Sequence, residues 1–132
     1  MSRLLLQICT AVLALVPIAT GIISMRGARD PLYRPLQLPE SPVLDSNLRF
    51  FGGVWLGLGL ALLWTVPTIE HQGILFRSVW VAVFLGGIGR LLSWLVLGAP
   101  PLPFIGFLLL EIVGAPLFIY WQWRVAQSTV AG

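Results

Sequence analysis

The chain alternates long apolar stretches with short polar connections. Four stretches are apolar for about the length that crosses a hydrocarbon core of ~30 Å. They comprise residues 4–24, 50–66, 79–97 and 104–121. The connections between them are too short to form a separate soluble domain. The pattern predicts an all-α integral membrane protein, an up-and-down four-helix bundle in which residues 1–132 form a single transmembrane domain.

Composition supports the same class. The chain is 58% hydrophobic and 10% charged, with a mean hydropathy of +0.92, which is typical of integral membrane proteins and not of soluble cores. The stretch 4–24 is too long for a secretory signal and ends without a small-x-small cleavage pattern. We therefore interpret it as the first transmembrane helix.

An even number of spans places both termini on one side of the membrane. Aromatic anchors at three helix ends favour this alternation, and they are Trp64, Trp80, Tyr120, Trp121 and Trp123. Three arginines, Arg3, Arg77 and Arg124, lie on the side of the termini, and three, Arg26, Arg29 and Arg34, lie in the first connection on the other side. This balance does not favour either orientation and leaves open dual insertion in an antiparallel homodimer. We expect the commoner arrangement, with cytoplasmic termini in a bacterial plasma membrane.

Arg90 and Glu111 are ionisable residues inside two different apolar stretches. Arg90 lies seven residues before Leu97, and Glu111 lies seven residues after Phe104. At 1.5 Å per residue, each is ~10 Å below the membrane surface formed by residues 98–103. A lone charge at the centre of a spanning helix costs roughly 2.5–3.5 kcal/mol. We therefore predict that the two residues compensate each other in one buried site.

The same half of the predicted bundle contains further polar residues. The first connection emerges on the side of residues 98–103, which places the polar start of the second span near the Arg90 level. Gly86, Gly87 and Ser93 lie close to Arg90 on one helical face, and small residues of this kind permit close helix approach. The candidate ligand-binding residues are Asp45, Asn47, Arg49, Arg90, Ser93 and Glu111.

Two further patterns suggest how the helices pack. In the second span, Gly53-x-x-x-Gly57 offers a small-residue seam. In the fourth, Phe104, Phe107 and Phe118 lie on the same side as Glu111 and would form an apolar wall beside the carboxylate. A cavity that is partly apolar and partly polar is the expected result.

Most reaction classes lack their motifs in this sequence. There is one His and one Cys, no Gly-x-Ser-x-Gly turn and no Walker-type loop, so no catalytic residue and no metal site can be assigned. The sequence contains no recognisable catalytic motif and favours a protein that is not an enzyme. The excess of positive charge comes from arginines that flank lipid-embedded helices. Such arginines indicate anionic lipids, and not nucleic acid, as partners.

Several motifs carry a resemblance to a known family. These are residues 44–53 (LDSNLRFFGG), Gly57-x-Gly59, residues 89–93 (GRLLS) with Gly98-x-Pro100, and Glu111. Together they resemble an uncharacterised bacterial four-helix membrane family, domain of unknown function 4345. The layout is also similar to the DoxX and DoxD group, some of whose members are associated with quinone-linked oxidoreductases. The first resemblance implies a bacterial plasma-membrane protein and no reaction, and it singles out Asn47, Arg49, Arg90 and Glu111.

We hypothesise from these residues that the chain is a membrane protein that binds a ligand. Arg49 and Arg90 would donate to an anionic or carbonyl-bearing amphiphile, a lipid or a quinone, while Glu111 and Asp45 balance the charge. One alternative is a structural or accessory subunit of a homo-oligomer or larger membrane complex, in which the pair only fixes helix packing. Another is a small proton-coupled transporter that titrates Glu111, which a neighbouring arginine disfavours.

Overall fold

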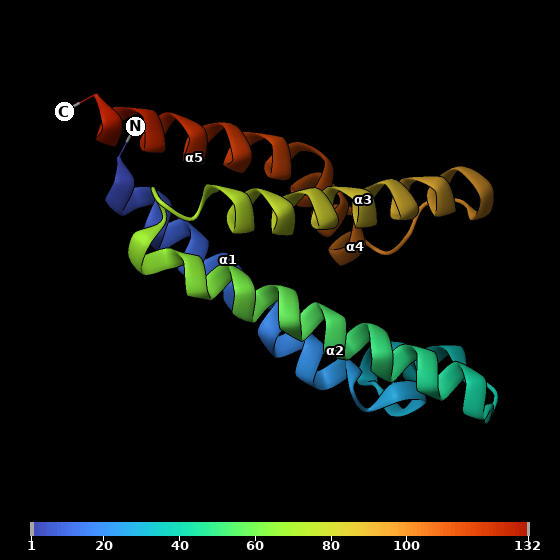
Figure 1. The fold of residues 1–132 in the computed structure, drawn as a ribbon. Coiled ribbons are helices and arrows are strands. Elements are labelled where there is room, and N and C mark those ends of the chain that lie inside the picture. Colours follow the sequence, from blue (N-terminus) through green and yellow to red (C-terminus); the bar gives the residue numbers. More distant parts are fainter. Residues whose placement is uncertain (1, 132) are drawn as a thin grey trace. The chain divides into compact units, whose positions relative to one another are not determined.

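The structure, a computed structural model, describes residues 2–131, and its regular elements there are all helical (Figure 1). The α-helices are α1 (Arg3–Ser24), α2 (Pro42–Thr65), α3 (Gly73–Leu97), α4 (Leu102–Leu109) and α5 (Ala115–Val130). Three short 3₁₀ segments lie in the connections, and they are η1 (Gly27–Arg29), η2 (Pro31–Leu36) and η3 (Val66–Thr68). A π-helical segment, η4 (Leu110–Gly114), joins α4 to α5. The predicted all-α class is confirmed.

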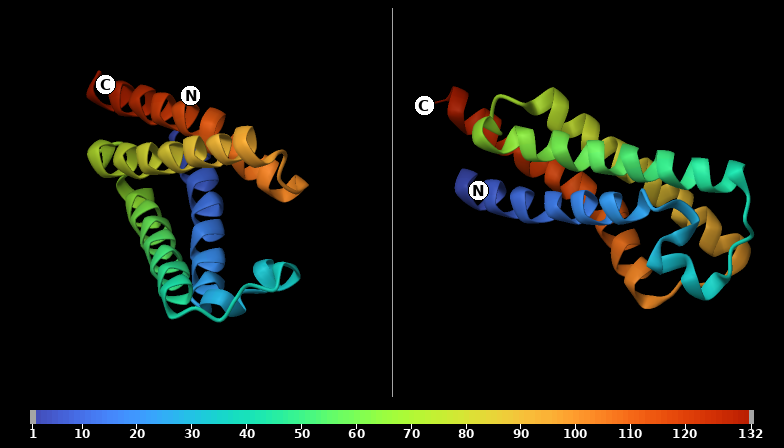
Figure 2. Two further views of the ribbon diagram at one scale, coloured as in Figure 1. Left: turned by 90° about the vertical axis from the view of Figure 1, so that its right-hand side faces the viewer. Right: turned by 90° about the horizontal axis from the view of Figure 1, so that it is seen from below.

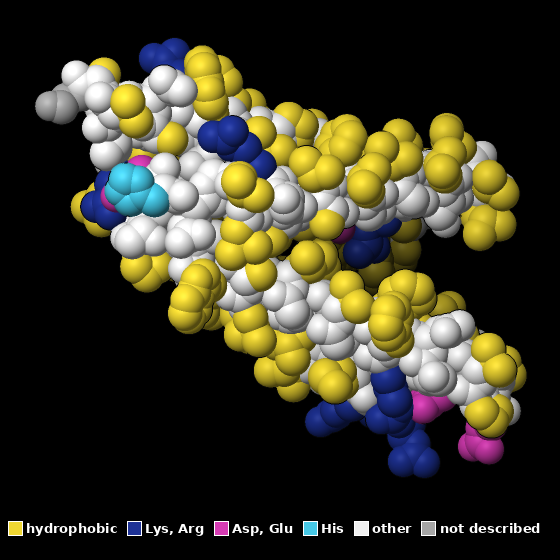
Figure 3. All heavy atoms as spheres, viewed as in Figure 1, with side chains coloured by type: hydrophobic (Ala, Val, Ile, Leu, Met, Phe, Trp, Pro, Cys, Tyr) yellow, Lys and Arg dark blue, Asp and Glu magenta, His cyan; other side chains and the backbone are white. Residues whose placement is uncertain are grey.

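Four helical segments of the described chain are long and apolar enough to span a membrane. They are Arg3–Ser24, Pro42–Thr68, Gly73–Leu97 and Leu102–Val130. On the face in Figure 3, hydrophobic side chains cover much of the helical surface. At the end of α3, for example, Leu95, Val96 and Leu97 are 74, 79 and 83% exposed. Surfaces of this kind require a lipid environment, so the protein is a multi-pass membrane protein.

The helices extend beyond the apolar stretches that predicted them. The second was expected to start at residue 50, but α2 starts at Pro42, directly after Ser41, whose hydroxyl accepts a hydrogen bond from the backbone N–H of Leu44 at 3.4 Å. A serine N-cap followed by proline is a strong helix start. The capping residues, and not hydropathy, set this boundary. Asp45, Asn47 and Arg49 therefore lie on the helix itself.

The chain divides into two compact units. Unit 1 combines the start of α1, up to Gln7, with the residues from Pro67 onward, and unit 2 comprises Ile8–Val66. The single domain and the up-and-down bundle stay predictions.

Unit 2 is built on a close antiparallel contact between α1 and α2, which lie side by side in Figures 1 and 2. A β-carbon at Gly21 would lie 2.6 Å from the backbone nitrogen of Leu56, and one at Gly52 would lie 2.8 Å from the backbone nitrogen of Met25. These distances leave no room for a side chain. The two glycines therefore allow the helix backbones to touch.

The predicted helix-packing seam at Gly53 and Gly57 is wrong, because the face of α2 that contacts α1 contains other glycines. A β-carbon at either position meets no atom of residues 2–131 within 4 Å, whereas one at Gly59 would lie 2.9 Å from the side chain of Pro17. The glycines that face α1 are thus Gly52 and Gly59, seven residues apart and on one helical face. The Gly-x-x-x-Gly pattern is present but points elsewhere.

Unit 1 packs α3 against η4 and α5. The ring of Trp80 stacks on Phe118 with centroids 4.7 Å apart. Gln122 is fully buried: its amide oxygen accepts from Nε of Arg77 at 2.9 Å, and its amide nitrogen donates to the carbonyl of Ile69 at 2.9 Å. This one glutamine therefore joins α5, α3 and the connection before α3.

An ion pair joins the start of α1 to the second connection within unit 1. Nε of Arg3 donates to Oε2 of Glu70 at 2.7 Å, and Nη2 donates to the carbonyl of Pro67 at 3.0 Å. Burial raises the pKa of Glu70, but the hydrogen bond from Arg3 and the charges of Arg3 and His71 outweigh it. The net pKa lies below the ordinary value of 4.5.

This lowered pKa predicts an acid-sensitive contribution to stability. A carboxylate that is easier to ionise when folded stabilises the fold fully above its ordinary pKa, and the contribution is lost as the pH falls through the folded pKa. We expect Glu70→Gln to lower unfolding free energy at pH 7 by about 0.5–1 kcal/mol, and to remove part of the decline below pH 4.5. Denaturant unfolding in detergent at stepped pH measures both. Glu40→Gln in the exposed first connection is the control, and an equal effect there would contradict this role for Glu70.

Candidate functional site

Arg90 and Glu111 form an ion pair inside the membrane-spanning part of unit 1. Nε of Arg90 lies 3.0 Å from Oε1 and 2.9 Å from Oε2 of Glu111. The carboxyl side chain is 6% exposed and the arginine side chain 40% exposed. The predicted mutual compensation of these two residues is therefore confirmed. The carboxylate is thus nearly buried, whereas the arginine side chain is partly exposed.

The position of Glu111 depends on the π-helical segment η4. Pro116 cannot donate a hydrogen bond to the carbonyl of Ile112, and its ring would clash with that carbonyl in a regular α-helix. The wider turn immediately before Pro116 relieves this conflict. Glu111 lies within that turn. Such π segments are frequent at functional sites, and apolar periodicity could not reveal this one.

Gly87 on α3 allows the carboxylate to approach. A β-carbon at Gly87 would lie 2.7 Å from Cβ of Glu111 and 3.0 Å from Cδ1 of Ile112. By contrast, β-carbons at Gly86 and Gly89 meet nothing within 4 Å among residues 2–131. Of the three glycines around this turn of α3, Gly87 is thus the one that the ion pair requires. Glycine at this position brings the helix backbones close enough for Arg90 to reach Glu111.

Two phenylalanines from α4 flank the guanidinium. The Cζ atom of Arg90 lies 5.7 Å from the ring centroid of Phe104 and 5.8 Å from that of Phe107, which is cation–π distance. Their rings meet edge to face at 6.2 Å. These two rings thus form an apolar wall beside the guanidinium of Arg90, whereas the sequence predicted a wall beside the carboxylate of Glu111. Phe118 is not part of it, because it stacks on Trp80.

The guanidinium has donors left over. Arginine carries five N–H groups, and among the described residues only Nε of Arg90 has an acceptor. Nη1 and Nη2 are without a hydrogen-bond partner in the described part of the chain. Four charged N–H donors are therefore presented at the partly exposed end of the side chain, between aromatic rings.

Asp45 and Arg49 form a second, separate ion pair in unit 2. Nε of Arg49 donates to Oδ2 of Asp45 at 2.6 Å, and Nη1 donates to the carbonyl of Met25 at 2.9 Å. The other oxygen of Asp45 accepts from the backbone N–H of Ala28 at 3.0 Å and from Nη2 of Arg49 at 3.4 Å. The pair thus provides hydrogen-bond partners for backbone groups at the end of α1 and the start of η1. Most of its hydrogen-bonding capacity is used inside the protein.

Asp30 belongs to the same polar region, and sequence reasoning missed it. Its side chain is fully buried, accepting from the Ser24 hydroxyl at 2.9 Å and from the backbone N–H of Leu32 at 2.9 Å. An aspartate directly before Pro31 is an N-cap signal, and it was available in the sequence.

The remaining two candidates make no comparable contacts. Asn47 and Ser93 are exposed, and within residues 2–131 their side chains have no hydrogen-bond partner. Arg90 with Glu111 lies in unit 1 and Asp45 with Arg49 in unit 2, so a single pocket containing all six residues stays a prediction.

These observations define an all-α, multi-pass membrane protein with an intramembrane arginine–glutamate pair. The chain belongs to the family described as "Domain of unknown function (DUF4345)", whose model matches residues 5–122. Searches of curated proteins and of solved structures gave no match. The matched range contains every candidate residue. None of the comparisons supports the expected similarity to the DoxX and DoxD group.

Proposed function

We propose that this protein binds a membrane amphiphile, and that Arg90 holds its oxygen-bearing head. The observation that carries the proposal is that Nη1 and Nη2 of Arg90, inside an apolar span, have no acceptor in the part of the chain that the structure describes. Hydrocarbon offers no acceptor for them, and charged groups at this depth are costly unless compensated. Glu111 compensates the charge, but within residues 2–131 its carboxylate accepts a hydrogen bond from Nε of Arg90 alone.

The chemistry of the site narrows the ligand class. A planar guanidinium matches two oxygens of a phosphate, a carboxylate or adjacent carbonyls. The carboxylate of Glu111 repels a head that brings negative charge close to it, so the head must approach from the exposed side of Arg90. Phe104 and Phe107 offer apolar contact to the adjoining tail or ring. A phospholipid and a quinone share these features.

Native mass spectrometry of the protein released from detergent tests the proposal. Three probes are added in turn: phosphatidylglycerol, phosphatidylcholine and a short-chain ubiquinone. We expect the wild type to retain one molecule of phosphatidylglycerol or of the quinone more than the double variant Arg90→Leu with Glu111→Leu does. The occupancy of that molecule should fall about tenfold or more in the double variant, as expected for charge-assisted hydrogen bonds. Which probe is retained separates a lipid head from a quinone head.

Arg90→Lys and Arg34→Leu sharpen this experiment. Lysine keeps the charge opposite Glu111 but not the planar fork, so it should retain the ligand weakly. Arg34 lies in η2, and its side chain is exposed, so Arg34→Leu should bind as the wild type does. Equal retention by the wild type and the double variant would refute binding at Arg90. That outcome would favour the structural alternative, which the close contact of Gly87 with Glu111 also supports.

A further inference from the structure

A groove separate from the arginine–glutamate pair lies between α3 and α5 of unit 1. Its volume is about 440 Å³, within the range of roughly 300–1,000 Å³ that small-molecule sites occupy. Its lining residues are Arg77, Val81, Phe84, Pro116, Ile119, Tyr120 and Trp123. Six of these seven are apolar or aromatic. Because both flanking helices span the membrane, the groove is open to lipid.

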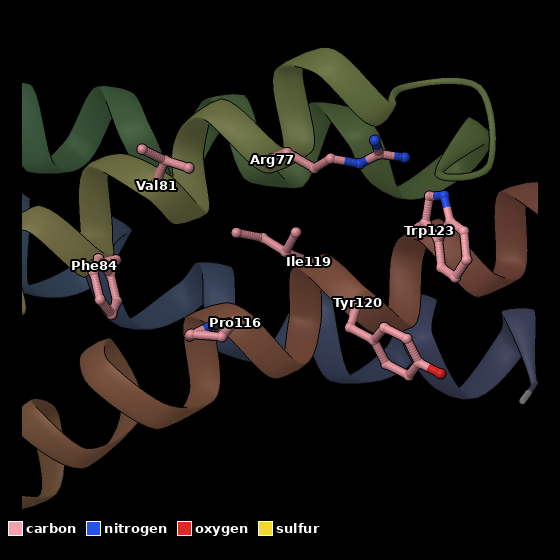
Figure 4. A pocket seen from close by; sticks show the side chains of 7 residues that line it. All are labelled: Arg77, Val81, Phe84, Pro116, Ile119, Tyr120 and Trp123. Carbon is pink, nitrogen blue, oxygen red and sulfur yellow. The ribbon is translucent and has the colours of Figure 1, made fainter.

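The two ends of the groove differ in chemistry (Figure 4). Arg77, Tyr120 and Trp123 gather toward one end, and Val81 and Phe84 lie toward the other. Arg77 is four residues from the start of α3 at Gly73, and Phe84 is seven residues further along. At 1.5 Å per residue the cationic end is ~6 Å from the helix terminus and the apolar end ~10 Å deeper. The groove therefore becomes apolar along the direction in which an acyl chain enters the membrane.

Arg77 has unused hydrogen-bond donors at the end of the groove that lies near the start of α3. Its Nε donates to the buried Gln122 at 2.9 Å, and this bond fixes the side chain. Nη1 and Nη2 have no acceptor among the residues that the structure describes. Arg124 lies one residue beyond Trp123, and its Nη1 donates to the hydroxyl of Tyr120 at 3.2 Å. Two arginines at the aromatic end produce a local field that attracts an anion.

The start of α3 strengthens the attraction of this end of the groove for an anion. A β-carbon at Gly73 would lie 3.2 Å from Nη2 of Arg77, so the guanidinium is next to the first turn of the helix. Gln72, the N-cap residue, makes no side-chain hydrogen bond to that turn. The positive end of the helix dipole and Arg77 therefore act together on any group bound there. A zwitterionic head gains less from this field than an anionic one.

We infer that this groove binds one anionic phospholipid, with its phosphate at Arg77 and one acyl chain along Val81, Phe84 and Ile119. A peptide does not fit as well, because its backbone N–H and C=O groups would meet almost no polar partner in an apolar lining. The occupant is therefore a lipid of the surrounding bilayer, selected by charge. This site is independent of Arg90 and Glu111.

Photolabelling in lipid nanodiscs tests the inference. The probe is phosphatidylglycerol with a diazirine in one acyl chain, compared with phosphatidylcholine carrying the same diazirine. Labelled peptides are mapped by mass spectrometry. We expect the phosphatidylglycerol probe to label the groove residues of α3 and α5 about fivefold more than the phosphatidylcholine probe, the effect of one well-placed arginine. Arg77→Gln should remove this preference.

A groove-filling variant keeps the test independent of Arg77, whose replacement also disturbs Gln122. Val81 is 48% exposed, so Val81→Trp fills the groove without changing the core and should abolish groove labelling. Val96→Trp, on the same helix and 79% exposed, should label as the wild type does. Equal labelling by the two probes, or unchanged labelling in Val81→Trp, would overturn the inference and leave only exchangeable surrounding lipid. The Arg90→Leu with Glu111→Leu variant should keep the groove signal.

Discussion

Gly52→Ala is expected to destabilise the protein by about 1–3 kcal/mol, the usual effect of overpacking, whereas Gly53→Ala is not. A β-carbon at Gly52 would lie 2.8 Å from both the backbone nitrogen of Met25 and the backbone carbonyl carbon of Ser24. Backbone atoms of a helix cannot move aside as a flexible side chain can. The two helices must therefore separate, and the contact between α1 and α2 is lost.

Gly53→Ala is the matched control for this effect. The neighbouring glycine is in the same helix, and its β-carbon would meet no atom within 4 Å among residues 2–131. Alanine also has the higher helix propensity, by about 0.8–1.0 kcal/mol in soluble helices. Unfolding of each variant in mixed micelles with increasing dodecyl sulfate measures the difference. Equal stability of the two variants would show that α1 and α2 are not held by this glycine contact.

The contrast between Gly52 and Gly53 shows what sequence reasoning could not reach. A glycine pattern with a spacing of four reveals that small residues share a face, but it does not reveal which face meets a partner. In α2 the contacting face contains Gly52 and Gly59, while Gly53 and Gly57 are turned away. To decide which of the two faces contacts α1, one must know the position of α1 in the tertiary structure.

Counting along the spans was sufficient for Arg90 and Glu111. Both are seven residues from the same short connection, and helical rise is constant enough to bring them level. The structure pairs them at 2.9–3.0 Å. The π segment that carries Glu111 adds a detail that hydropathy lacks, although Pro116 was a visible reason to expect an irregular turn nearby.

The sequence around the first connection contains local signals that pair Asp45 with Arg49. Asp45 and Arg49 are four residues apart and form a hydrogen bond at 2.6 Å, as helix neighbours of opposite charge do. Their expected position, just before the second span, rested on a span that began at residue 50. Because Ser41 and Pro42 start α2 earlier, these side chains lie within α2 and connect the end of α1 to η1.

Single replacements at the intramembrane ion pair should be far more damaging than replacement of both residues. Arg90→Leu leaves the nearly buried carboxylate of Glu111 without its cation, and Glu111→Leu leaves the guanidinium without its anion. Each should lower the unfolding free energy by about 3–5 kcal/mol, the usual result of breaking a buried pair. The double change to leucine removes both charges from the apolar span. Its stability should return to within about 1–2 kcal/mol of the wild type, because apolar replacements of buried pairs are often near neutral.

The same unfolding assay in mixed micelles supplies the double-mutant cycle, and the coupling free energy between positions 90 and 111 is its readout. Leu109→Ala is the control in the same membrane segment, since its side chain is 60% exposed and should not couple to Arg90. A coupling below about 0.5 kcal/mol would mean that the two residues act independently and that each is compensated by something else in the membrane. A large coupling combined with unchanged lipid or quinone retention would make the pair a packing device. A large coupling with lost retention would make Glu111 the residue that holds Arg90 in place for its ligand, because the carboxylate fixes Nε and leaves both Nη atoms free.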